Sequence, residues 1–209
     1  MKLIRLLLAP LALFSFASPA GAAEKLVLAF GDSLTVGYNL PPRQGFAPQL
    51  EAALRKQGIS ARVHNAGVSG DTTAQGKARL RWVLGSLKSK PDVAIVELGA
   101  NDMLRGLDPG QAEANLDAIL AELQRQKIRT LLAGMAAAPN LGRAYAKRFD
   151  PIYPRLAAKY RVALYPFFLA GVVNDRSLHI GDAIHPNERG VSVIVRGILP
   201  QVKHLLTTP

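Results

Sequence analysis

Short apolar runs alternate along the chain with segments of helical periodicity, and this alternation strongly limits the folds that the chain can adopt. The runs lie at residues 26–30, 62–66, 93–98, 130–135 and 162–167. Turn-forming residues bound each run, and the runs are apolar on both faces, which is typical of strands buried in a parallel sheet. Each run therefore predicts a strand that is covered from both sides.

Helical segments separate these strands. Apolar side chains recur at helical spacing in residues 46–54, 112–123, 145–160 and 191–205. Pro151 and Pro154 interrupt the third segment and Pro200 the fourth, so we expect a break or a kink at these positions. Five strand–helix units predict an α/β fold with three layers, in which helices cover both faces of a doubly wound, five-stranded parallel sheet.

The N-terminus has the pattern of an export signal. Lys2 and Arg5 precede an apolar run that is too short to span a membrane, and a stretch of small residues follows it. We predict a signal peptide over residues 1–23, one domain over residues 24–209, and a periplasmic or secreted location. The alternative is an N-terminal anchor that is not cleaved.

Composition limits the chemistry and the partners of this protein. The sequence has no cysteine, which excludes a disulfide, a thiol nucleophile and a thiolate metal site. Its formal net charge of +11 favours contact with an anionic surface such as acidic lipid headgroups. The basic residues, Arg79 among them, are scattered along predicted helices, so we interpret them as a solvated surface and expect no nucleic-acid partner. No obligate protein partner is predicted.

Polar residues follow three of the predicted strands at the point where each strand ends. Ser33 follows the first strand, Gly67 the second and Asn101 the third. In open α/β sheets the ligand crevice lies beyond the carboxyl ends of the strands, so we expect these residues to meet. Asp182 and His185 follow the fifth strand, in a loop that is able to return to the same edge.

Ser33 and His185 are the candidates for a nucleophile and its general base. A serine hydroxyl becomes a good nucleophile only when a base removes its proton. Asp182 precedes His185 by three residues, a spacing at which its carboxylate can accept from Nδ1 and leave Nε2 free for serine. Simpler interpretations remain open: Ser33 as a helix N-cap, and Asp182 as a turn residue beside an exposed histidine.

Asn101 is the candidate for stabilising negative charge on a substrate oxygen. Its side-chain amide, together with the backbone N–H groups of Ser33 and Gly67, can donate to a developing oxyanion. The alternatives are an Asx-turn at Asn101 and a tight turn at Gly67. We interpret Asp32 and Asp102 as hydrogen-bond acceptors that order the loops.

Four segments together resemble a known family. They are residues 31–38, 65–72, 98–106 and 182–187, which begin Gly-Asp-Ser-Leu, Asn-Ala-Gly-Val, Leu-Gly-Ala-Asn and Asp-Ala-Ile-His. Their order and spacing are similar to the four conserved blocks of the SGNH (GDSL) hydrolases, in the branch of acyl-CoA thioesterase I, lysophospholipase L1 and arylesterase. The serine, glycine, asparagine and histidine of the family name match Ser33, Gly67, Asn101 and His185. This chain has Gly-Ala-Asn-Asp where some relatives have Gly-Gly-Asn-Asp.

The resemblance implies a flavodoxin-like sheet and a serine esterase or thioesterase. Such an enzyme hydrolyses aryl esters, acyl thioesters or lysophospholipids through an acyl-enzyme intermediate, with no metal or organic cofactor. One alternative is an O-deacetylase of cell-wall or other glycans; another, of a different class, is a non-catalytic binding protein for lipids or anionic polymers. The sequence lacks the Gly-x-Ser-x-Gly of α/β-hydrolases and the His-Glu-x-x-His of zinc proteases.

Overall fold

The computed structural model describes residues 23–208, and five strands form its central sheet. They are β1 (Lys25–Gly31), β2 (Ala61–Gly67), β3 (Val93–Glu97), β4 (Arg129–Ala133) and β5 (Ala163–Tyr165). Their order is β2-β1-β3-β4-β5, and every neighbouring pair is parallel. The predicted doubly wound sheet is confirmed. The predicted signal peptide lies, except for its last residue, outside the described residues.

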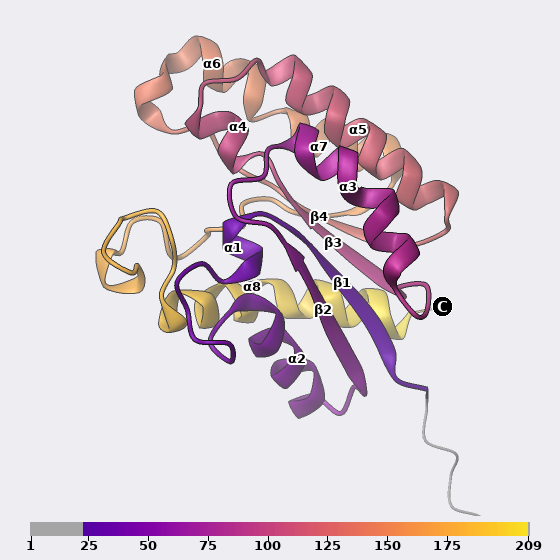
Figure 1. Ribbon diagram of the computed structural model, residues 1–209. Coiled ribbons are helices and arrows are strands. Elements are labelled where there is room, and N and C mark those ends of the chain that lie inside the picture. The colour runs from indigo at the N-terminus through magenta and orange to yellow at the C-terminus, as the bar shows by residue number, and fades with distance from the viewer. Residues whose placement is uncertain (1–22, 209) are drawn as a thin grey trace, which may run out of the picture.

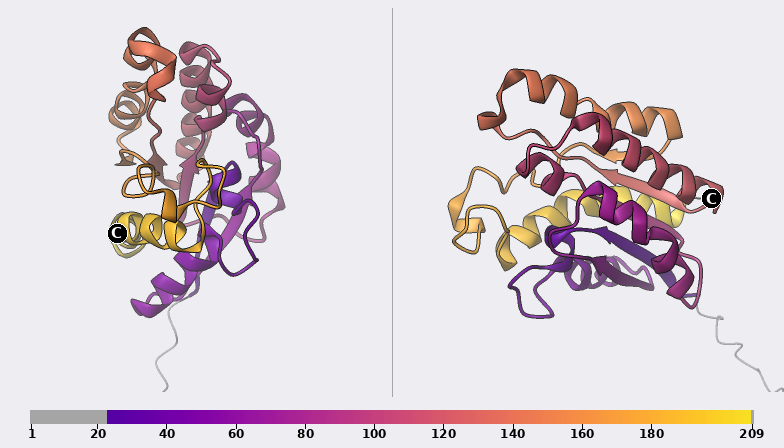
Figure 2. Two further views of the ribbon diagram at one scale, coloured as in Figure 1. Left: turned by 90° about the vertical axis from the view of Figure 1, so that its left-hand side faces the viewer. Right: turned by 45° about the horizontal axis from the view of Figure 1, so that its top comes forward.

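Helices cover both faces of this sheet. They are α1 (Ser33–Val36), α2 (Phe46–Lys56), α3 (Thr73–Ser86), α4 (Ala100–Leu104), α5 (Pro109–Arg125), α6 (Gly142–Phe149), α7 (Ile152–Tyr160) and α8 (Glu188–Thr207). In Figures 1 and 2, α3, α5 and α7 lie over one face, whereas α2 and α8 lie over the other. None of the helices in residues 23–208 is long and apolar enough to cross a membrane.

Burial agrees with the prediction for the inner strands and contradicts it at the two edges of the sheet. Every residue of β3 is buried, and so is every residue of β1 after Lys25, as expected for strands covered from both sides. The edge strand β2 is not covered in this way, because Arg62 and Asn65 are exposed. The other edge strand, β5, is only half-buried and is shorter than predicted, since it comprises only Ala163–Tyr165. Pro166 follows it and has no N–H to continue the hydrogen-bond ladder.

The prolines act differently at the three predicted positions. The expected break at Pro151 is present, because α6 ends at Phe149 and α7 begins at Ile152. Pro154 lies in the first turn of α7, where a missing N–H costs no intrahelical hydrogen bond. Pro200 lies inside α8, which continues through it to Thr207.

Three strands end level with one another at the carboxyl edge of the sheet. Gly31 of β1 pairs with Gly67 of β2 and with Glu97 of β3. A Cβ at Gly31 would lie 2.1 Å from Thr35 Oγ1 and 2.5 Å from the carbonyl oxygen of Glu97, so only glycine fits there. The strands β1 and β3 are spatial neighbours but not consecutive in sequence, which makes their carboxyl ends the switch point where ligands bind in such sheets.

Candidate active site

Ser33 lies at the first position of α1, separated from the end of β1 by Asp32. The N-cap of this helix is Asp32, whose Oδ1 accepts from the N–H of Leu34 at 3.0 Å. The interpretation of Ser33 as the N-cap is therefore wrong, and its hydroxyl is not used to cap the helix. Ser33 is only 8% exposed, because the edge of the sheet and the loops around it enclose the residue.

The structure brings Ser33, His185 and Asp182 together in one hydrogen-bonded row. The Nε2 atom of His185 lies 2.9 Å from Ser33 Oγ, although the two residues are 152 positions apart. The Nδ1 atom lies 2.6 Å from Asp182 Oδ2. An Nδ1–H that donates to Asp182 leaves Nε2 as an acceptor for the serine proton, which is the geometry that serine hydrolases require.

The Asp182 carboxylate also organises its own turn. Its Oδ1 accepts from the backbone N–H of Ile184 and of His185, at 3.0 and 2.9 Å. Partial burial acts to raise the pKa of Asp182, but these bonds and the imidazole of His185 outweigh it and lower the pKa to about 2. The Tyr38 ring packs against the imidazole with 4.6 Å between ring centroids.

A loop beyond the sheet edge carries Asp182 and His185 (Figure 1, orange to yellow, between β5 and α8). His179 and Pro186 form an isolated antiparallel bridge across it, and the N–H of Ile180 donates to the carbonyl of His185. These bonds fold the segment back on itself. The histidine is thereby presented to the end of β1, as the sequence allowed but did not require.

Asn101 connects all three loops at the switch point. It lies in the first turn of α4, after Gly99, whose φ of 114° favours glycine. Its Nδ2 donates to Asp32 Oδ2 at 3.1 Å, after β1, and to the carbonyl of Asp71 at 3.0 Å, after β2. The side chain therefore bonds to the two neighbouring loops and not to its own turn.

Gly67 does not reach this cluster with its N–H. That group donates to Asn65 Oδ1 at 3.0 Å. The next N–H along the chain, that of Val68 just after β2, donates to the carbonyl of Gly31 in β1. Because successive N–H groups of a strand point to opposite sides, the N–H of Gly67 points away from β1 and from Ser33. Its role as an oxyanion donor stays a prediction, and this geometry counts against it.

Gly70 is a better placed glycine in the same sequence block. It has a φ of +85°, and the next residue, Asp71, contacts Asn101 through its carbonyl. The N–H of Gly70 makes no hydrogen bond within residues 23–208, and the same holds for the N–H of Ser33. The signal in the sequence is the Ser-Gly-Asp turn that closes the block, whose glycine lies three residues after Gly67.

Asp32 and Glu97 form a buried acidic pair behind Ser33, and neither is accessible to solvent. Glu97 Oε2 accepts from Thr35 Oγ1 at 2.7 Å, while its Oε1 has no partner within residues 23–208. Burial raises the pKa of Asp32 to about 6, against the lowering effect of hydrogen bonds from Leu34 and Asn101. Burial and the nearby Asp32 raise the pKa of Glu97 well above its usual range.

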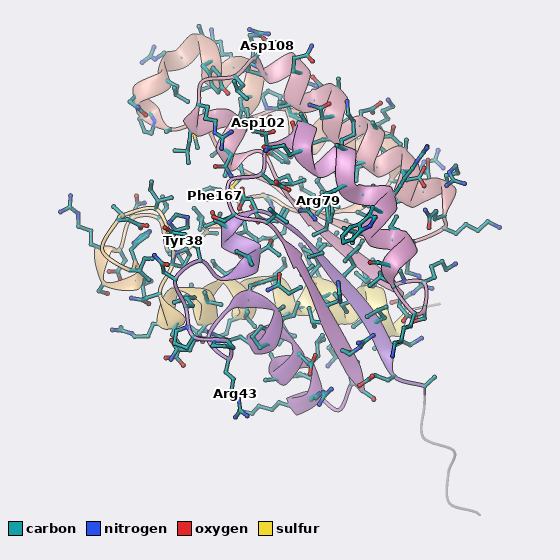
Figure 3. All side chains as sticks on the ribbon, in the orientation of Figure 1. Tyr38, Arg43, Arg79, Asp102, Asp108 and Phe167 are labelled. Atoms are coloured by element: carbon teal, nitrogen blue, oxygen red, sulfur yellow. The ribbon has the colours of Figure 1, made fainter. Side chains whose placement is uncertain are left out.

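Two charged residues near the site were interpreted from the sequence, with opposite outcomes. Asp102 accepts from the N–H and the hydroxyl of Thr73, at 2.8 and 2.7 Å, and so orders the start of α3 as expected. Arg79, expected on a solvated surface, has a side chain only 18% exposed and bonds to Asp71 at 2.6 Å. Figure 3 shows both residues beside the carboxyl edge of the sheet.

A cavity of about 600 Å³ opens beside Ser33 and His185. Most of its lining is apolar, including Met103, Leu104, Met135, Phe167, Leu169 and Val173. Phe167, one of these lining residues, is labelled in Figure 3. A cavity of this size and lining accommodates an extended apolar ligand group.

Comparison with known proteins places the chain in a family. The GDSL-like Lipase/Acylhydrolase family matches residues 29–193. An arylesterase of Vibrio mimicus is 36% identical over 204 residues, which cover 97% of this chain and 100% of that protein. The thioesterase 1/protease 1/lysophospholipase L1 of Escherichia coli K12 is 35% identical over 187 residues, which cover 90% of this chain and 87% of that protein.

A solved structure agrees with this. The crystal structure of AlinE4, an SGNH-hydrolase family esterase, is 51% identical and superposes with a TM-score of 0.76, covering 90% of this chain and 99% of that one. The chain belongs to the SGNH (GDSL) hydrolase family, and it is an enzyme of the ester- and thioester-hydrolysing type. The resemblance stated from the four sequence blocks is thereby confirmed.

Proposed function

We propose that this protein hydrolyses carboxylic esters and thioesters through an acyl-enzyme formed on Ser33. The observation that carries the proposal is the row of contacts from Ser33 Oγ to His185 Nε2, at 2.9 Å, and from His185 Nδ1 to Asp182 Oδ2, at 2.6 Å. The row provides a nucleophile, a general base and an acid that orients the base. It therefore supports acyl transfer to serine.

In the first half of the reaction, His185 Nε2 takes the proton from Ser33 Oγ as Oγ bonds to the acyl carbon. The tetrahedral intermediate then loses its alcohol or thiol, which takes that proton from His185. In the second half, His185 deprotonates a water molecule that attacks the acyl-enzyme, and the proton returns to Ser33 as the carboxylic acid leaves. Asp182 stays ionised throughout and stabilises the imidazolium.

The oxyanion of each intermediate is received by the N–H groups of Ser33 and Gly70 and by the amide of Asn101. Both N–H bonds of the Asn101 amide have acceptors in the structure, Asp32 and the carbonyl of Asp71. A negatively charged oxygen is a stronger acceptor than a neutral carbonyl. We therefore propose that the oxyanion draws one N–H away from Asp71 as charge develops.

The apolar cavity supports an acyl group longer than acetyl. Its volume of about 600 Å³ and its methionine, leucine and phenylalanine lining suit a hydrocarbon chain. The relatives named arylesterase and thioesterase 1/lysophospholipase L1 support aryl esters, acyl thioesters and lysophospholipids as substrate classes. A glycan O-deacetylase would instead need a polar surface for the sugar.

The test is hydrolysis of p-nitrophenyl esters from acetate to palmitate by the wild-type protein and by Ser33→Ala. We expect activity that depends on Ser33 and is greatest on an ester longer than acetate. Stoichiometric labelling of Ser33 by a fluorophosphonate would identify the nucleophile independently. Activity that survives in Ser33→Ala contradicts the mechanism, and activity on acetyl esters alone favours the deacetylase.

We further propose that the active-site edge contacts the surface of an anionic lipid aggregate. Within residues 23–208, six of the seven exposed large apolar residues lie in loops or at a helix end at this edge: Tyr38, Val68, Leu104, Leu107, Val173 and Ile184. The seventh, Trp82, lies on α3. An apolar edge on a protein with a net charge of +11 is suited to an interface of acidic amphiphiles.

Vesicle co-sedimentation tests this contact. We expect the protein to bind phosphatidylglycerol vesicles more than phosphatidylcholine vesicles, and the double variant Val68→Glu with Leu107→Glu to bind less. Neither residue lines the cavity, so hydrolysis of a soluble short ester serves as the internal control. Trp82→Glu is the matched apolar-to-acidic control on another surface. Equal loss of binding in both variants contradicts a contact through the active-site edge.

Export remains a proposal that rests on the sequence of residues 1–23. The basic start, the apolar run and the small residues after it support cleavage close to Glu24. Expression in a bacterium followed by fractionation and N-terminal sequencing tests it. A protein that retains Met1 contradicts the proposal.

A further inference from the structure

Each of the three guanidinium nitrogens of Arg79 donates a hydrogen bond to a different segment beside the candidate active site. Its Nε donates to Asp71 Oδ2 at 2.6 Å. Its Nη1 donates to the carbonyl of Ala66 at 2.8 Å, and its Nη2 to the carbonyl of Gly31 at 2.9 Å. The Cζ atom lies 4.2 Å from the centre of the Phe30 ring. One side chain thus holds the end of β1, the end of β2 and the loop after β2.

Two of these acceptors belong to, or directly precede, the residues to which Asn101 donates its hydrogen bonds. Asp71, whose carboxylate binds Arg79, accepts one N–H of Asn101 with its carbonyl at 3.0 Å. Gly31 immediately precedes Asp32, whose Oδ2 accepts the other N–H at 3.1 Å. The orientation of the Asn101 amide is therefore set by two groups that Arg79 holds in place.

We propose that Arg79 is a positioning residue for oxyanion stabilisation. It acts through Asp71 and the end of β1, and not on the substrate. The inference rests on the proposed role of Asn101. A donor stabilises the transition state only when it lies within about 2.7–3.1 Å of the place where the oxyanion forms. A small shift of Asp71 would therefore weaken catalysis without weakening ester binding.

Arginine suits this place for a geometric reason. Its planar fork directs N–H bonds to several acceptors at fixed angles, whereas the ammonium of lysine is a point charge on a flexible stem. The ion pair is largely buried, with the Arg79 and Asp71 side chains 18% and 7% exposed. Deleting the cation would leave Asp71 buried and unpaired, which destabilises a fold. The informative substitution is therefore Arg79→Lys, which keeps the charge and removes the fork.

The first measurement compares Arg79→Lys with Arg81→Lys, each normalised to active sites titrated with a fluorophosphonate. Arg81 lies two residues further along α3, and its side chain is 81% exposed, which makes it a matched control. We expect the kcat of Arg79→Lys on p-nitrophenyl butyrate to fall roughly 10- to 100-fold, somewhat less than for removal of an oxyanion donor. Its KM is expected to stay within about 2-fold, because the ester ground state does not use these donors.

The second measurement uses a trifluoromethyl ketone, which adds reversibly to Ser33 and produces an oxyanion. Its affinity for Arg79→Lys should fall by the same factor as kcat/KM, whereas binding of the product acid should not change. A structural role alone would lower the melting temperature and the fraction of titratable sites, but not these ratios. If the wild-type protein reacts with no fluorophosphonate at all, the proposed function fails before the inference is tested.

Equal kcat/KM per titrated site in Arg79→Lys and Arg81→Lys would overturn the proposal. If Arg79→Lys does not fold, Asp71→Asn decides the question, because asparagine keeps an oxygen acceptor for Arg79 but loses the charge. For that variant we expect kcat to fall roughly 3- to 10-fold at unchanged KM, because a weaker bond from Arg79 to residue 71 would displace the Asn101 amide only slightly. An unchanged kcat in Asp71→Asn would also overturn the proposal.

Discussion

Two aspartates lie next to the candidate active-site residues, and their surroundings push their pKa values in opposite directions. Asp182 is in a surface loop, with a side chain 38% exposed, and hydrogen bonds outweigh its burial and lower its pKa to about 2. Asp32 is inaccessible to solvent and faces a second buried acid, and burial raises its pKa to about 6. The same residue type thus serves two purposes.

The difference shows that the site has a local half and a tertiary half. Asp182 bonds to residues two and three positions away, so its turn is largely determined by a short stretch of sequence. Asp32 bonds to Asn101, 69 positions away, and its N–H donates to Glu97. Substitutions in the local half should therefore alter the general base His185 directly. Those in the tertiary half should alter the position of the Asn101 amide and the stability of the fold.

The largest effect is expected from removing the residues where the two halves meet. Ser33→Ala and His185→Ala should each lower kcat by roughly 10⁴ or more, because either change removes the nucleophile–base pair. Initial rates on one p-nitrophenyl ester measure this. His204→Ala, on the exposed face of α8, is the histidine control. A His185→Ala variant with the rate of the control would remove the general base from the mechanism.

Asp182→Asn tests the local half and should lower kcat by up to roughly 10⁴, because an amide cannot hold the imidazole in the required tautomer. Asp175→Asn is the matched control, since Asp175 lies in the same loop and its Oδ1 likewise accepts an N–H two residues on, from Ser177. Steady-state kinetics of both variants decide the matter. Equal rates would show that Asp182 only shapes the turn.

Asn101→Ala tests the tertiary half and should lower kcat by roughly 10²–10³, the usual effect of losing one oxyanion donor. The KM should change little. The exposed Asn140, in the short 3-10 helix Pro139–Leu141, supplies the control Asn140→Ala. If KM rises while kcat is retained, Asn101 binds the ground state instead.

The contributions of the two aspartates to folding stability should change in opposite directions with pH. Asp182 has a lowered pKa, so it stabilises the fold above about pH 4 and loses this as the pH falls towards 2. Asp32 has a raised pKa, so its contribution is most favourable below about pH 4 and declines as the pH rises through 6. Between pH 4 and 7 the raised pKa of Asp32 should lower the free energy of unfolding of the wild-type protein by about 2–3 kcal/mol, and we expect Asp32→Asn to abolish this decrease. Denaturant unfolding at the two pH values tests it, and an unchanged difference contradicts the raised pKa.

The smallest effect is expected at Tyr38, whose ring contacts the imidazole of His185. Tyr38→Leu should lower kcat about 2- to 5-fold, because the ring restricts the imidazole but supplies no proton, and one aromatic contact contributes about 0.5–1.5 kcal/mol. Tyr160→Leu, on α7 and away from the cavity, is the control. A loss as large as that of Asp182→Asn would mean that Tyr38 has a chemical role.

Much of the fold followed from local patterns. The strands and the stripes of α2, α5 and α8 were predicted because burial on one or both faces leaves a period in the sequence. The break at Pro151 followed from the missing N–H. The extent of β5 was overestimated, because the apolar run continues past Pro166, where the ladder stops.

The sequence by itself determined the candidates for the chemistry and which of them share a turn: Ser33 after a strand, Asn101 after another, and Asp182 three residues before His185. Only the tertiary structure decided that Ser33 and His185 meet, that the N–H of Gly67 points away, and that Arg79 is internal. The physical reason is the range of the interactions. Periodicity and turns depend on neighbours in the chain, whereas hydrogen-bond partners, burial and the pKa values that burial shifts depend on residues brought together only by packing.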